Sequence, residues 1–181
     1  MTTNPPVPGL HDQGLAQFRA GQYQAALHTF ETARDQAQAA QDKVGLAEAA
    51  NDLGVTYQQL KQRDAARKSL DTAISLFTEL NDDVKRAQAM GNLGTLLADM
   101  GNYRDAEIRL EQSAELFHRV GDAQNESLTL KWLSRTHLRH LDFLGAIFAY
   151  DRALARLEPL PPEQQMLRRI LQVPLRILMR G

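Results

Sequence analysis

The stretch GNYRDAEIRLEQSAELF, residues 101–117, decides the fold, because the chain contains almost the same helix a second time. GQYQAALHTFETARDQA, residues 21–37, has a glycine, a tyrosine and an alanine at corresponding places, and a later alanine shifted by one position. In both stretches the apolar residues recur at spacings of three and four, which is typical of an amphipathic helix. The repetition predicts a fold built from copies of one helical unit.

Aligning the chain with itself shows that the period is forty residues. Three columns of this alignment hold small or turn-forming residues: Gly14, Gly54, Gly94 and Ser134; Ala26, Ala66, Ala106 and Ala146; and Asp42, Asp82 and Asp122, with Pro162 in the fourth place. A fixed period of this length indicates a repeat protein whose units stack on one another.

Each forty-residue unit predicts two helices. Helix A is expected near residues 9–20, 43–60, 83–100 and 123–140, and helix B near residues 22–40, 63–80, 103–120 and 143–158. The aspartates before helix A are suitable N-caps, and Asn102 and Asp142 are expected to cap two of the B helices. We expect close packing at the small columns, because Gly54 facing Ala66 lets two helix backbones approach.

The composition describes a globular protein. The chain has 181 residues, of which 43% are hydrophobic and 24% charged, enough for one domain with a sizeable core. A net charge of −1 gives no general electrostatic case for nucleic acid or membrane. The chain has no cysteine, which excludes disulfides and is compatible with a reducing compartment. Without an apolar run long enough for a bilayer or a signal-peptide layout, we predict a soluble, cytoplasmic protein with a disordered lead at residues 1–8.

Two pairs of segments carry a family resemblance. AEAANDLGVTY with DAARKSLDTA, and AQAMGNLGTLL with DAEIRLEQSA, resemble the tetratricopeptide repeat, in its forty-residue variety. The resemblance implies an all-α, right-handed α-solenoid of four helix-turn-helix repeats in residues 9–160, near 9–40, 43–80, 83–120 and 123–158. A capping and interface helix is expected in residues 161–181. It also implies a non-catalytic scaffold that binds a protein or peptide partner in a concave groove lined by the A helices, without a cofactor.

One stripe of each A helix would face this groove, because residues spaced i, i+4 and i+8 share a helix face. The stripe reads Asn51, Val55 and Gln59 in the second repeat, Gly91, Thr95 and Asp99 in the third, and Lys131, Arg135 and Arg139 in the fourth. Three cations unbroken by an acid could bind the carboxylates of an acidic peptide. The alternative is a solvated basic face that binds nothing.

A second candidate set lies one position further along the same helices. The resemblance implies that Asn92 hydrogen-bonds the backbone of a ligand, with Asn51 as a neighbour. Asp12 and Asp52 stand in the column of Asn92, but a carboxylate accepts hydrogen bonds and cannot donate them. Trp132 holds this column in the fourth repeat, where it either anchors a partner or packs against the following helix.

The C-terminal segment EQQMLRRILQVPLRILMRG, residues 163–181, has two apolar stripes. We expect one to pack against the preceding helix, namely Met166, Ile170, Val173 and Ile177. The other would form an uncovered face for self-association, namely Leu167, Leu171, Leu175 and Leu178. Pro174 is expected to kink or interrupt the helix. The alternative function is therefore a structural homo-oligomer, such as a homodimer, with no separate peptide ligand.

Other classes of site find little support in the sequence. His137 and His140 are three residues apart, but no third metal ligand of obvious spacing accompanies them. The chain has no phosphate-binding glycine loop and no serine nucleophile motif, so we predict no catalytic residue. The Lys/Arg stripe of the fourth repeat lacks aromatic residues interleaved across several repeats, so it gives little support to binding of single-stranded nucleic acid. An enzyme or a nucleic-acid binder stays open as the alternative from another class.

Overall fold

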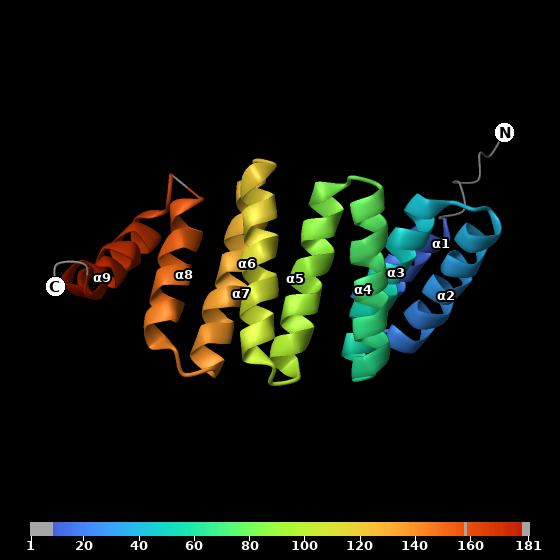
Figure 1. Ribbon diagram of the computed structural model, residues 1–181, viewed down its shortest axis with the longest axis horizontal. Coiled ribbons are helices and arrows are strands. Elements are labelled where there is room, and N and C mark those ends of the chain that lie inside the picture. Colours follow the sequence, from blue (N-terminus) through green and yellow to red (C-terminus); the bar gives the residue numbers. More distant parts are fainter. Residues whose placement is uncertain (1–8, 158, 179–181) are drawn as a thin grey trace. The chain divides into compact units, whose positions relative to one another are not determined.

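The computed structural model describes residues 9–157 and 159–178, with side chains as far as residue 172. These residues form the helices α1 (Leu10–Arg19), α2 (Tyr23–Ala39), α3 (Lys43–Gln59), α4 (Arg63–Glu79), α5 (Asp83–Asp99), α6 (Tyr103–Arg119), α7 (Ala123–Arg139), α8 (Phe143–Ala155) and α9 (Pro162–Leu178) (Figure 1). The predicted all-α class and every predicted A and B helix are therefore confirmed. The main difference in length is in α8, which ends at Ala155 instead of near residue 158.

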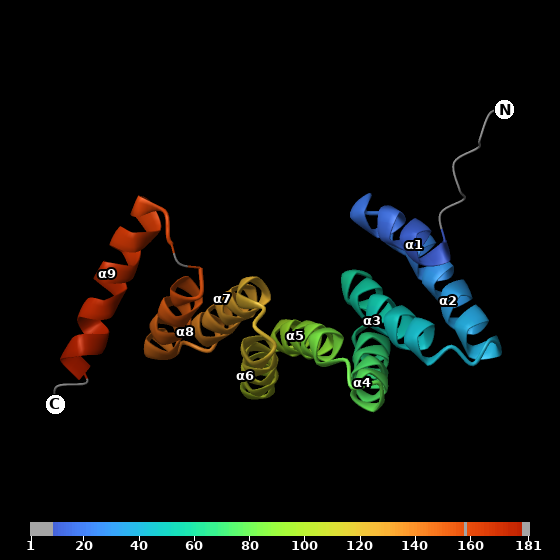
Figure 2. The ribbon, with the colours of Figure 1, turned by 90° about the horizontal axis from the view of Figure 1, so that it is seen from above.

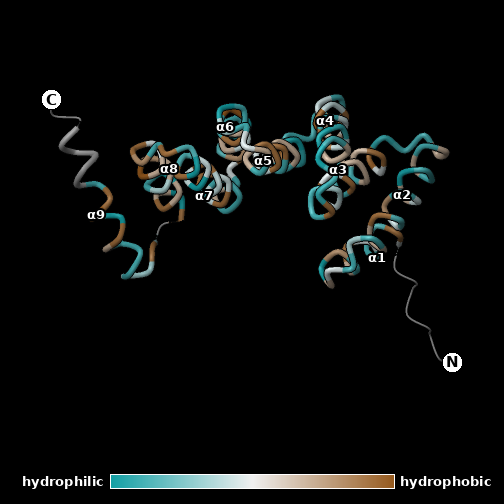
Figure 3. The backbone as a smooth tube through the Cα atoms, turned by 90° about the horizontal axis from the view of Figure 1, so that it is seen from below, coloured by the Kyte–Doolittle hydropathy of each residue, from teal (hydrophilic) through white to brown (hydrophobic). Residues whose placement is uncertain are grey.

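The chain divides into two compact units at Asp82. The first unit contains α1 to α4 and the second contains α5 to α9. Within each unit, every helix packs against the next one along the chain, and α5 also contacts α7 (Figure 2). Hydrophilic and hydrophobic residues alternate along these helices, as expected when one face of each helix is buried (Figure 3).

The turns that connect α1 through α8 share one backbone geometry, and it recurs every twenty residues. Each has a residue in the left-handed region, with φ between 55° and 82°: Gly21, Gln41, Lys61, Asn81, Gly101, Gly121 and Leu141. Two backbone hydrogen bonds close each turn. In the first turn, the N–H of Gly21 donates to the carbonyl of Phe18, and the N–H of Gln22 donates to the carbonyl of Gln17. This pattern of hydrogen bonds is the Schellman motif. The turn geometry of the backbone recurs every twenty residues, whereas the side-chain pattern recurs every forty.

The turn geometry predicts that Lys61→Gly stabilises the chain. Lys61 has φ 62°, where a side chain costs roughly 1–2 kcal/mol, partly offset by the roughly 0.5–1 kcal/mol of extra entropy that glycine loses on folding. We expect the free energy of unfolding in urea to rise by about 0.5–1 kcal/mol. Lys68→Gly, in the middle of α4, is the control and should lower it by about 1 kcal/mol. A loss of stability from Lys61→Gly would contradict this account of the turns.

Aspartate side chains cap α3, α7 and α8, as predicted for Asp42, Asp122 and Asp142. Their carboxylates accept hydrogen bonds from the backbone N–H groups of Val44 and Gly45, of Asn125, and of Gly145. Backbone and side-chain hydrogen bonds from Asn125 hold the pKa of the Asp122 carboxyl below its ordinary value. The prediction for Asn102 is wrong, because its side chain makes no cap hydrogen bond.

The column of small residues lies where helices A and B of one repeat come closest. A Cβ atom added to Gly54 would lie 2.5 Å from Cγ of Leu70 and 3.3 Å from the carbonyl oxygen of Ala66. At Gly94 the corresponding distances are 2.6 and 3.3 Å. The predicted close packing is confirmed, with leucine as the nearest neighbour. In the fourth repeat Ser134 takes this place, and its hydroxyl donates a 2.7 Å hydrogen bond to the corresponding alanine carbonyl.

Two further buried serines tie the helices of a repeat together. Ser113 Oγ on α6 donates to the carbonyl of Ala87 on α5 at 2.7 Å. Ser127 Oγ on α7 donates to the carbonyl of Ala153 on α8 at 2.8 Å. Ala87 and Ser127 share one column of the alignment, and Ser113 and Ala153 share another. The third and fourth repeats therefore make the same contact, but the serine that donates lies on helix B in the third repeat and on helix A in the fourth.

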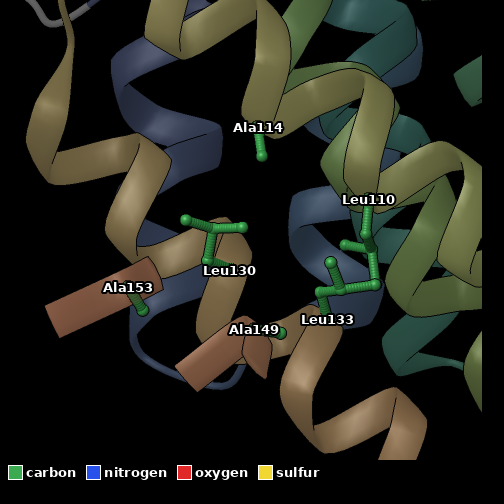
Figure 4. Close-up of a cluster of buried hydrophobic side chains, with 6 residues drawn as sticks. All are labelled: Leu110, Ala114, Leu130, Leu133, Ala149 and Ala153. Atoms are coloured by element: carbon green, nitrogen blue, oxygen red, sulfur yellow. The ribbon is translucent and has the colours of Figure 1, made fainter. Parts of the chain in front are cut away.

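The core of the second unit includes a cluster between α6, α7 and α8. Figure 4 shows its side chains gathered around Leu130 and Leu133 of α7 (Figure 4). The members, which are at most 3% exposed, are Leu110, Ala114, Leu130, Leu133, Ala149 and Ala153. This cluster fixes α7 between its neighbours and thereby determines which of its side chains face solvent.

None of the helices in the described part of the chain combines the length and apolar character needed to cross a membrane.

Candidate functional site

The cationic stripe of α7 ends in an ion pair. Nη1 of Arg139 donates a 3.0 Å hydrogen bond to Oδ1 of Asp99, and its guanidinium carbon lies 5.5 Å from the centroid of the Tyr103 ring. The hydrogen bond to Asp99 raises the pKa of Arg139 above its ordinary value. The three cations of the stripe stay unbroken by an acid of α7, but an acid of α5 pairs with the last of them. Arg135 is exposed and Lys131 half-buried, and neither forms an ion pair with an acid among the described side chains.

The ion pair between Asp99 and Arg139 joins two successive repeats within one column of the alignment, since forty residues separate the two. It brings the C-terminal ends of α5 and α7 together, so their predicted stripes lie side by side at that end. Both side chains are largely exposed, and such pairs contribute about 0–1 kcal/mol to stability. The main effect of the pair is therefore on the local distribution of charge.

Apolar surface adjoins these cations on α7. Trp132 is 41% exposed and Leu128, one turn earlier, is 52% exposed. The guanidinium carbon of Arg135 lies 5.4 Å from the centroid of the Trp132 ring. A cation–π contact at an exposed site is worth about 0.5–1 kcal/mol. Trp132 is thus only partly packed against the protein, and α7 presents cations and apolar surface together.

In the first unit, the predicted residues lie on α3. Asn51 and Val55 are half-buried and Gln59 is exposed. Nδ2 of Asn51 lies 3.5 Å from Oδ1 of Asp52, and Asp52 lies 3.2 Å from Nδ1 of His11. The polar groups of this face therefore interact within their own unit.

On α5, Asn92 and Thr95 are half-buried. The hydroxyl of Thr95 donates a 2.8 Å hydrogen bond to the carbonyl of Asn92, within the same helix. Thr95 therefore offers mainly its methyl group for contact.

The C-terminal helix α9 faces its neighbour differently from the prediction. Met166 is 66% and Ile170 is 55% exposed, so their predicted packing against the preceding helix is wrong. Another face of α9 meets α8, where Nε of Arg168 and Nε2 of Gln172 each donate a 3.2 Å hydrogen bond to Oδ1 of Asp151. Val173 and Ile177, the other two residues of that predicted stripe, lie outside the residues whose side chains are described.

The leucines predicted for self-association lie only partly within the described side chains. Leu167 is 39% exposed and Leu171 is half-buried. Leu175 and Leu178 lie outside the described side chains. The helix continues through Pro174 to Leu178, so Pro174 does not interrupt it, and a kink at this residue stays a prediction.

The sequence reasoning missed Glu126, which is only 3% exposed. Oε1 of Glu126 lies 2.7 Å from Nε of Arg156, the residue that follows α8. Oε2 of Glu126 lies 3.2 Å from Nδ1 of His118 on α6. One buried carboxylate therefore links three successive helices. The repeat alignment contained no signal for it, because Arg86 and Leu46 stand in the same column.

Two histidines share one carboxylate on α6. Nδ1 of His140 lies 3.0 Å and Nδ1 of His137 lies 3.3 Å from Oε1 of Glu107, and His137 also lies 3.1 Å from Oδ2 of Asp142. Among the described residues, no group of three or more ligands has the geometry to hold a metal ion. The arrangement serves to tie α6 to the end of α7.

The chain consists of tandem helical hairpins in a forty-residue register, with a glycine or serine at the close contact within each repeat. These features define a class, the helix-turn-helix repeat protein. A family model described as Tetratricopeptide repeat matches residues 9–79 and 85–158. The chain belongs to this family. No curated protein matches it.

Solved structures with a similar fold include two repeat proteins. One is BtubC (BKLC) from P. vanneervenii, at 20% identity and a TM-score of 0.73, over 86% of this chain. This chain spans 63% of the length of that protein. The other is a Podosopora anserina putative kinesin light chain with nearly identical TPR-like repeats, at 14% identity and a TM-score of 0.66, over 92% of this chain and 94% of that one. At these identities the likeness shows the fold alone.

Proposed function

We propose that this chain is a non-catalytic interaction module that binds an acidic peptide segment on the surface formed by α5 and α7. Tetratricopeptide repeats are generally protein-interaction modules, which supports the general part of the proposal. The observation that carries the specific part is the face of α7, where Lys131 and Arg135 adjoin the exposed apolar surface of Leu128 and Trp132.

The mechanism combines charge and apolar contact. Carboxylates of the peptide would accept charge-assisted hydrogen bonds from Arg135 and Lys131, which are stronger than neutral ones. The contact with Trp132 restrains Arg135 before the ligand arrives, which lowers the entropy cost of binding. Because Asp99 already engages Arg139, the acidic groups would bind nearer the middle of α7. A micromolar complex, about −8 kcal/mol, is the affinity expected for a short peptide.

The remaining predicted residues extend this proposal. Asn92 and Thr95 on α5 would border the ligand, with Asn92 hydrogen-bonding its backbone. In the first unit, the face of α3 with Asn51, Val55 and Gln59 is equivalent by register, and we propose that it forms a surface of the same kind.

Arg135→Glu tests the assignment. Peptides selected from a random library on the immobilised protein are expected to be acidic, and their labelled forms can be titrated by fluorescence anisotropy. Reversing the charge should weaken binding at least about 30-fold, or about 2 kcal/mol, by removing an attraction and adding a repulsion. Helicity and melting should hardly change, because Arg135 is exposed.

Arg104→Glu, at an exposed position of α6, makes the same change of charge and should bind like the wild type. Equal binding by the wild type and Arg135→Glu would remove the basis for placing the site on α7.

A structural homo-oligomer assembled through α9 is the second candidate. It is favoured by the exposed apolar side chains of Met166, Leu167 and Ile170. In that case the chain would need no separate peptide ligand.

A further inference from the structure

The outer face of α8 carries a row of exposed apolar side chains. Leu141, Leu144 and Phe148 are 74%, 49% and 54% exposed. Leu144 and Phe148 are four residues apart and so share one side of α8. Leu141 stands in the turn before the helix. Ile108 of α6, which is 49% exposed, lines the same groove of about 410 Å³ as Phe148. We call these four side chains the outer apolar patch.

The other repeats act as an internal control for this patch. Leu144 corresponds to Gln24, Asp64 and Arg104, Leu141 to Gly21, Lys61 and Gly101, and Phe148 to His28, Lys68 and Ile108. Helices with polar residues at these places have the same backbone and turn geometry as α8. Packing of the repeat therefore does not require apolar side chains there. Exposed apolar groups beyond what packing requires usually mark an interface.

The size of the outer apolar patch fits a protein surface better than a short ligand. A large side chain presents roughly 200 Å² when fully exposed, so the four together present roughly 400 Å². Phe143, which is 62% exposed at the start of α8, adds roughly 100 Å² beside them. A standard interface buries about 800 Å² per partner, of which the apolar share is about 500 Å².

Two acidic groups that line the groove, Glu107 and Glu111, have partners within the chain. Nη1 of Arg152 lies 2.6 Å from Oε1 of Glu111, and the same guanidinium carbon lies 5.9 Å from the centroid of the Phe148 ring. Glu107 lies 3.0 Å from Nδ1 of His140. The ion pair of Arg152 with Glu111 therefore presents little net charge to an approaching identical surface and offers no strong opposite field to a highly charged partner.

We propose that the outer apolar patch binds the same patch of a second copy of this chain in a two-fold symmetric dimer. A two-fold interface places one surface against itself, so no complementary second surface is needed. The patch lies on α6, α8 and the turn before α8, and it shares no residue with the proposed peptide surface. A variant that loses dimerisation is therefore expected to keep peptide binding, and the reverse, so the two proposals are tested separately.

Sedimentation velocity of the full chain, from about 1 to about 100 μM, tests the proposal. The wild type is expected to change from monomer to dimer within this range. The double variant Leu144→Arg with Phe148→Lys should weaken the dimer at least about 100-fold and stay monomeric throughout. These replacements occur at the equivalent places of α6 and α4, so α8 is expected to accept them. Circular dichroism checks this, and the single variant Phe148→Lys replaces the double variant if it does not fold.

Leu171→Glu on α9 is the matched control and should leave the dimer intact. Dissociation by this change alone would assign the contact to α9 and overturn the proposal. A wild type that is monomeric at every concentration would also overturn it, as would a dimer that persists in the folded patch variant.

Discussion

Gly94→Leu is expected to lower the free energy of unfolding of the second unit by about 3 kcal/mol. A Cβ atom alone would lie 2.6 Å from Cγ of Leu110, which is fully buried, and 3.3 Å from the carbonyl oxygen of Ala106. Overpacking a core usually costs about 1–3 kcal/mol, and here the rest of the leucine must also find room. Urea unfolding followed by the fluorescence of Trp132, the single tryptophan of the chain, would report on the unit that contains Gly94.

Gly94→Ser is the matched control, because Ser134 occupies this column in the fourth repeat. Its hydroxyl can donate to the facing carbonyl as Ser134 does, so we expect a smaller loss, about 1 kcal/mol. An equal loss of stability from Gly94→Ser and Gly94→Leu would contradict the view that the close approach of the two helices requires a small residue here.

Arg156→Ala is expected to cost about 3 kcal/mol. It removes the 2.7 Å partner of Glu126, whose side chain is only 4% exposed, and leaves the carboxylate with His118 alone. Removing one partner of a buried pair costs about 3–5 kcal/mol, and the value should lie at the lower end because Arg156 itself is 38% exposed. Thermal and urea unfolding of the purified variant measure it.

Combining Arg156→Ala with Glu126→Gln separates the two causes of this loss. The neutral amide removes the unpaired buried charge, so the double variant should recover part of the stability lost by Arg156→Ala. A cost below about 0.5 kcal/mol for Arg156→Ala would show that the pair behaves like a surface ion pair.

The helices could be predicted because the positions that must be small recur in the sequence. Gly54 and Gly94 are required by contacts with a leucine and a carbonyl of the next helix, so the alignment shows them directly. The twenty-residue repeat of the turns was not visible, because backbone hydrogen bonds alone define it. Residues as different as Gly121, Lys61 and Leu141 occupy the left-handed position.

The stripe of α7 could be predicted, but its charge distribution could not. Arg139 and Asp99 stand in one column, and only the packing of α5 against α7 brings them together. The burial of Glu126 could not be predicted, because its partners Arg156 and His118 lie on two other segments that only the folded chain brings together. The orientation of α9 was predicted from the register of earlier repeats, but a different face, which carries the ion pair of Arg168 with Asp151, meets α8.

The most direct test of the proposed role is an NMR titration of the ¹⁵N-labelled protein with a selected acidic peptide. The account predicts saturable shifts of the single indole N–H signal, from Trp132, and of the backbone amides of Lys131 and Arg135. The amide of Ile108 on the outer apolar patch should stay in place. Saturable shifts confined to helices other than α5 and α7, with the Trp132 signal unmoved, would contradict it.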